Sequence, residues 1–121
     1  EKINSRGTSL YVLKLHERMN DDGLLYMTVP HLNVPTSYKH FQHFNLKKIK
    51  SYFEEHFRFE KVQYIQKTSV FLKIINRLMN NGLYIITNSY LNNLYYSFYK
   101  KYFFFANEQN CERIYIKMRK K

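Results

Sequence analysis

The stretch LHERMNDDGLLYMTVPH, residues 15–31, contains the end of a helix, a tight turn and a strand in immediate succession. The turn lies at residues 20–23, because Asp and Asn close local turns with their own backbone and Gly23 tolerates positive φ. The apolar run at 24–29 then predicts a strand buried on both faces, as in a parallel sheet. Pro30 ends this strand because proline cannot donate to a ladder.

The order of the expected elements along the chain is helix, strand, helix, strand, two helices and strand. Thr8 or Ser9 is expected to cap the first helix, and Asn45 the second, because their side-chain oxygens can accept from an unpaired backbone amide. Residues 31–44 carry turn signals but no apolar period, which indicates a loop. Hydrophobic periodicity predicts helices at 8–20, 46–57, 70–81 and 90–106, and strands at 24–29, 59–68 and 113–119.

The composition indicates one small globular domain. The chain has 121 residues, of which 45% are hydrophobic and 18% aromatic, enough for a packed core and against outright disorder. No stretch approaches the roughly 18 to 20 apolar residues of a membrane span. The single Cys111 excludes an internal disulfide and a zinc site built on several thiolates. We therefore expect a cytoplasmic protein, and because it begins at Glu1 we expect it to be a piece of something longer.

The charge balance is strongly basic. Twenty Lys and Arg against nine Asp and Glu leave a formal net charge of +11. However, the chain is also rich in Lys, Asn, Tyr, Phe and Ile and poor in Gly, Ala and Pro, which are the replacements expected of an AT-rich coding sequence. The basic surplus therefore supports nucleic-acid binding only weakly, and a solvated background charge is the simpler interpretation.

Three runs resemble class I S-adenosylmethionine-dependent methyltransferases of the small-molecule or lipid type. Residues 15–31 are similar to that family's helix, turn and fifth strand, which read Leu-Lys-Pro-Gly-Gly followed by an apolar strand ending in Val-Pro. YKHFQHFNLKKIKSYFEEHFRFEKVQ, residues 38–63, is similar to its His-Phe-Thr segment, the next helix and the turn into the sixth strand, with Arg58 and Phe59 in place of Gly-Phe. CERIYIKMRKK, residues 111–121, resembles the antiparallel seventh strand.

The resemblance implies an α/β fold, the C-terminal half of a three-layer Rossmann-like domain in which the seventh strand inserts between the fifth and sixth. Residues 1–69 would form its helix-strand-loop-helix-strand part, 70–106 an aromatic helical insertion or cap, and 107–121 the closing strand. The family binds its cofactor through a Gly-rich loop and an acidic residue after the second strand. This chain has three isolated glycines and neither feature, so we expect the half that binds S-adenosylmethionine to be missing and this chain alone to be inactive.

The end of the first strand is the first candidate site, because open α/β sheets bind ligands beyond the carboxyl ends of their strands. This predicts substrate contacts for Thr28, Pro30 and His31. His31 could act as a general base, or it could merely line a loop and contact solvent. His43 is a further candidate, although it and His40 could simply orient the loop by hydrogen bonds to its backbone. No recognised metal-ligand spacing is present, so no metal is expected.

The aromatic helical insertion is the second candidate site. Its tyrosines, with Tyr95 and Tyr99 as the expected substrate contacts, could form a cap or an interfacial surface for an apolar or lipid-linked acceptor. Lys100 and Lys101 would then contact anionic groups. Alternatively, the aromatic residues pack the helices against each other or against the missing half.

The sequence thus predicts the C-terminal part of a methyltransferase acting on a small-molecule or lipid-linked acceptor. Its partners would be that acceptor and the missing N-terminal half, with peripheral membrane contact as a further expectation. Direct displacement needs few catalytic side chains, since the protein mainly aligns donor and acceptor. The alternatives are a basic, aromatic RNA-binding module, for which no sequence motif was found, and a membrane-surface interaction module.

Overall fold

The computed structural model describes residues 2–35 and 43–121, with side chains from Gly7 onward. Four helices and three strands make up the described chain. In order they are α1 (Lys2–Arg18), β1 (Leu24–Pro30), α2 (Leu46–Phe53), β2 (Phe57–Lys67), α3 (Val70–Met79), α4 (Ser89–Tyr102) and β3 (Cys111–Lys120). No helix in this part of the chain has the length and apolar character that crossing a bilayer requires.

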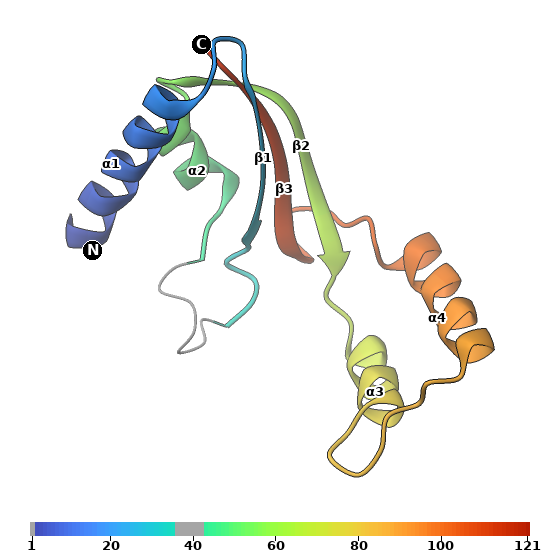
Figure 1. Ribbon diagram of the computed structural model, residues 1–121. Helices are drawn as coiled ribbons and strands as arrows, with labels where there is room; N and C mark the ends of the chain where they lie inside the picture. The colour runs from blue at the N-terminus through green and yellow to red at the C-terminus, as the bar shows by residue number, and fades with distance from the viewer. Residues whose placement is uncertain (1, 36–42) are drawn as a thin grey trace.

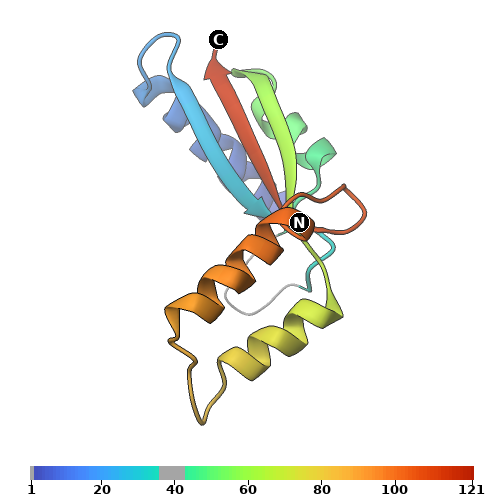
Figure 2. The same ribbon diagram turned by 90° about the vertical axis from the view of Figure 1, so that its right-hand side faces the viewer.

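The three strands form one sheet in the order β1-β3-β2. The last strand lies in the middle and runs antiparallel to both neighbours, so β1 and β2 point in the same direction. Helices α1 and α2 pack on one face of the sheet, and no described helix covers the other (Figures 1 and 2). The chain is therefore a mixed α/β structure with a three-stranded antiparallel sheet.

The hydrophobic core lies between the sheet and the two helices that cover it. Alternate residues of β3 point into it, and Ile114, Ile116 and Met118 are completely buried. Their partners on the outer strands face the same way, because paired residues of a sheet share a face. The buried core residues are Val12, Ile49, Phe53, Phe57, Ile114, Ile116 and Met118.

Two expectations for the N-terminal unit are wrong. Helix α1 extends back to Lys2, so Thr8 and Ser9 lie inside it and do not cap it. Strand β1 alternates between exposed and partly buried residues instead of being buried on both faces, since one face of the sheet is open. The turn between the two elements is as expected, with the Gly23 amide donating to the Asn20 carbonyl at 3.0 Å.

All four helices end earlier than their hydrophobic periodicity indicated, and the difference is largest for α2 and α4. Helix α2 ends at Phe53, because Phe57 already belongs to β2 and is buried in the core. Helix α4 ends at Tyr102, and the following residues pair with the end of β2: the amides of Gln66 and Lys67 donate to the carbonyls of Phe104 and Phe103 at 2.8 and 2.7 Å. Asn45 caps α2 as expected, with its side chain accepting from the Lys48 amide at 2.9 Å.

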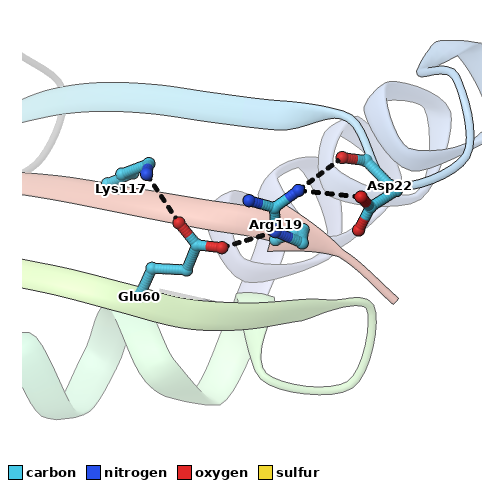
Figure 3. Close-up of polar contacts among 4 residues, drawn as sticks. All are labelled: Asp22, Glu60, Lys117 and Arg119. Atoms are coloured by element: carbon cyan, nitrogen blue, oxygen red, sulfur yellow. Dashed lines mark hydrogen bonds and ion pairs between the residues drawn. The ribbon is translucent and has the colours of Figure 1, made fainter.

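An ion network on the open face of the sheet links β2, β3 and the turn before β1 (Figure 3). Glu60 of β2 accepts from Lys117 at 2.7 Å and also from Arg119, both on β3. Arg119 also donates to the Asp22 carboxylate, which lies in the turn before β1, at 2.9 Å. Hydrogen bonds from Lys117 and then from Arg119 hold the pKa of Glu60 below its ordinary value. The charged form of Glu60 is thus favoured by folding.

We predict that Glu60→Gln reduces stability at neutral pH and that this loss shrinks in acid. A carboxyl whose pKa is lowered on folding stabilises the protein above its ordinary pKa, and the effect disappears as pH falls through the folded-state value. Urea unfolding of both proteins from about pH 7 to about pH 3 measures it. Glu55→Gln, at an exposed position before β2, is the control. A Glu60→Gln deficit that stays constant over this range contradicts the prediction.

Candidate functional site

The carboxyl ends of β1 and β2 lie at the same edge of the sheet, because both strands run antiparallel to β3 (Figure 1). This carboxyl edge, which we define by residues 28–35, 43–44 and 103–112, contains the first predicted site. Thr28 is exposed on the open face opposite Tyr115, and Pro30 lies opposite Arg113. The two residues therefore occupy the edge where ligands of α/β sheets bind.

His31 is buried at this edge, with 4% of its surface exposed. Its backbone amide donates to the Glu112 carbonyl at 2.8 Å, and its Nδ1 accepts from the Asn33 amide at 3.1 Å. The neutral ring therefore carries its proton on Nε2, which is buried without a hydrogen-bond partner among the described residues. The expectation that His31 contacts solvent is wrong. A role as general base stays a prediction.

His43, which precedes α2, is also buried and contacts the loop after β1. Its Nδ1 lies 2.7 Å from the Val34 carbonyl. Because a carbonyl can only accept, this nitrogen must be the donor. Such a bond orients the segment before α2, as the alternative interpretation of His43 proposed. His40 lies outside the described residues.

Asn33 connects the loop after β1 to the start of β3. Its side-chain amide donates to the carbonyls of Glu108 and Cys111, at 2.8 and 3.0 Å. Cys111 itself is completely buried, and burial raises the pKa of its thiol. A protonated, inaccessible thiol is a poor nucleophile. Cys111 therefore contributes packing to this edge.

Tyr95 and Tyr99 line a separate cavity of about 520 Å³ between α3, α4 and the end of β2. The Tyr95 hydroxyl donates to Asn76 Oδ1 of α3 at 2.7 Å, and the two tyrosine rings stack with centroids 6.3 Å apart. Gln66, Lys67, Ser69, Lys73 and Glu112 are among the other lining residues. This mixture of phenol, amide, ammonium and carboxylate groups could bind a polar ligand carrying hydroxyls.

Burial, and then the negative charge of Glu112, raise the pKa of the Tyr99 phenol. Tyr99 is consequently a neutral hydrogen-bond donor at neutral pH. A neutral phenol in a partly enclosed cavity can orient a ligand oxygen or nitrogen by donating to it. This chemistry suits binding and positioning better than proton abstraction.

The structure divides the six predicted site residues between two places. Thr28, Pro30, His31 and His43 lie along the carboxyl edge, whereas the other two line the cavity beside α4. Glu112 links the two places: it lines the cavity, and its carbonyl accepts from His31. No sequence pattern indicated Glu112 or Gln66, because each is a single polar residue near one end of a strand.

In the described chain, no group of three or more His, Cys, Asp or Glu residues is arranged to hold a metal ion. Comparison of the chain with protein-family models, curated proteins and solved structures found no match. The arrangement of the residues themselves is therefore the basis for assigning a function.

We predict that Asn33→Ala opens the carboxyl edge and exposes Cys111. Each lost hydrogen bond contributes about 1 kcal/mol, so two of them should raise the population of the open state by roughly tenfold or more. Because Cys111 is the only cysteine, the rate of its reaction with a thiol reagent under native conditions measures this opening. Asn93→Ala, at an exposed position of α4, should leave the rate unchanged. Equal rates for the two variants contradict the prediction.

Proposed function

We propose that this chain is the C-terminal part of a class I S-adenosylmethionine-dependent methyltransferase that acts on a small-molecule or lipid-linked acceptor. The observation that carries the proposal is the strand order β1-β3-β2, with the last strand antiparallel in the middle. This is the order that the resemblance implies for the fifth, seventh and sixth strands of the family. The position of α1 and α2 on one face of the sheet is also compatible with it.

The position of the helical pair supports an acceptor-binding role. Helix α3 follows the carboxyl end of β2 after two residues, and α4 returns to the same edge before β3 begins. In Figure 1 both helices lie beyond the arrowheads of β1 and β2, where open α/β sheets bind their ligands. The cavity lined by Tyr95 and Tyr99 would hold the acceptor. Thr28 and Pro30, at the end of β1, would contact the reactive end of the acceptor.

The residues of this chain do not fit the cofactor itself. Its glycines lie inside α1, in the turn before β1 and in the connection between α3 and α4, and none belongs to a loop after a strand. Bound elsewhere in a longer parent, S-adenosylmethionine would supply the methyl group for direct displacement. This chain would hold the acceptor and exclude water, which is the main protein contribution to such a reaction.

We predict that S-adenosylhomocysteine does not bind to the 121-residue chain but does bind when the chain is extended upstream in its own reading frame by about 100 residues, the rough size of the missing half. Isothermal titration calorimetry on the two polypeptides measures this. Tyr99→Phe in the extended polypeptide should leave this affinity unchanged, since Tyr99 is assigned to the acceptor. Absence of binding by the extended polypeptide would overturn the methyltransferase proposal.

Binding of single-stranded RNA is the second candidate function, and the open face of the sheet favours it. Lys117 and Tyr26 lie side by side there, with the ammonium 5.9 Å from the ring centroid. On such a surface, aromatic rings can stack on bases and basic side chains can contact phosphates. The strand register places five basic residues on this face, Arg58, Lys61, Arg113, Lys117 and Arg119.

If this face binds RNA, affinity for a mixed-sequence oligonucleotide should fall steeply with salt. Arg113→Ala should then reduce the slope of log affinity against log salt by about one, because one phosphate contact is lost. Fluorescence anisotropy at several salt concentrations measures both effects. Lys14→Ala, on α1 at the opposite side of the sheet, is the control. Failure of the oligonucleotide to bind at low salt excludes this candidate.

A further inference from the structure

We propose that the helical pair, defined as residues 68–107 with α3 and α4, docks on the surface of an anionic lipid membrane. The inference does not depend on the methyltransferase proposal, because it rests on the exposed side chains and charges of the pair alone. The membrane would be contacted peripherally, by side chains that enter its interface. The helices themselves would lie in the interface plane.

The helical pair exposes an unusual amount of apolar surface. Leu83 and Ile85 in the connection between the helices are 94% and 64% exposed, and Val70 and Tyr90 at the helix starts are 73% and 74% exposed. Soluble domains seldom leave so many large apolar side chains uncovered in one region, so the region is expected to contact a partner. The other exposed apolar residues of the pair are Phe71, Ile74, Leu78, Tyr84, Leu91, Leu94, Tyr96, Phe98, Tyr102 and Phe105.

The apolar and polar surfaces of the pair are separated. An apolar groove of about 490 Å³ runs between the helices and is lined by Phe71, Ile75, Leu91, Leu94 and Phe98, among others. The edge-to-face contact of Phe71 with Phe98, with ring centroids 6.3 Å apart, joins the two helices along it. The cavity beside Tyr99 has a polar lining instead. A one-sided apolar surface of this kind is typical of elements that lie in a membrane interface.

The charge of the pair specifies an anionic partner. From Thr68 to Asn107 the sequence contains no Asp or Glu, whereas the acidic residues of the chain all lie outside this segment. The same segment contains four basic residues, Lys73, Arg77, Lys100 and Lys101, of which Lys73 also lines the polar cavity beside Tyr99. Each is exposed. Basic residues beside an inserted apolar surface are attracted to acidic headgroups, which is the combination that binds an anionic bilayer.

The geometry leaves this surface accessible. In both views the helical pair projects beyond the end of the sheet, with the connection between the helices at its far end (Figures 1 and 2). The most exposed apolar residue, Leu83, lies in that connection. Lys101 near the other end of α4 lies over the Tyr102 ring, 5.2 Å from its centroid, a pairing suited to the level of the headgroups.

Co-sedimentation of the 121-residue chain with lipid vesicles tests the proposal. The chain should bind vesicles of phosphatidylcholine containing phosphatidylserine at least about tenfold more tightly than vesicles of phosphatidylcholine alone, and added salt should weaken this binding. Equal affinity for the two kinds of vesicle, or no binding to either, overturns the proposal.

Two variants locate the contact. Leu83→Asp should reduce the affinity for anionic vesicles about tenfold or more, because it replaces an inserted apolar group by a charge of the wrong sign. Leu10→Asp places the same change at an exposed position of α1, where 53% of the leucine surface is accessible. This control should bind like the parent. Circular dichroism verifies that both variants remain folded, and equal loss of binding in the two overturns the assignment to the helical pair.

A charge variant separates the lipid surface from other partners. Replacement of the four basic residues of the helical pair by glutamine should lower the affinity for anionic vesicles about 100-fold or more. The matched control replaces Lys14, Arg18, Lys47 and Lys50, which are exposed on α1 and α2. Sedimentation velocity is measured in parallel. Self-association without vesicle binding would assign the apolar surface to a second copy of the chain, and would overturn the proposal.

Discussion

The antiparallel insertion of β3 between β1 and β2 is the interaction on which the rest of this structure depends. Among the described residues, β3 is the strand with which both β1 and β2 pair. Its inward side chains, Ile114, Ile116 and Met118, form the floor on which both helices pack. Its outward side chains Lys117 and Arg119 bind the one carboxylate of β2 that faces them. The side chains on one face of β3 thus form the hydrophobic core, and those on its other face form the ion network.

Much of the fold could be predicted from the sequence because its strongest signals are local. The strict alternation at 113–119 predicted β3, and Asn45 predicted the start of α2. Errors arose where tertiary contacts override periodicity. Phe57 extends the apolar pattern of α2 but is buried in β2, and β1 has an apolar sequence on a face that nothing described covers.

The candidate site was less predictable, since its geometry depends on contacts between distant segments. The sequence placed Thr28, Pro30 and His31 at the end of a strand, where the structure also has them. It could not show that His31 is buried in a loop that Asn33 fixes by hydrogen bonds to residues more than 70 positions away. Nor could the spacing of residues predict that Glu112 lines the cavity beside Tyr99, because this depends on where β3 begins relative to the end of α4.

The position of the central strand in the chain has a consequence for synthesis on the ribosome. Strands β1 and β2 both precede β3, and the pairing of neither is satisfied until residues 111–120 have emerged. Until then the nascent chain holds two strands without their pairing partner, which favours aggregation. Cooperative folding of this sheet is therefore expected only after β3 has been synthesised, because β3 supplies the pairing partner of both outer strands.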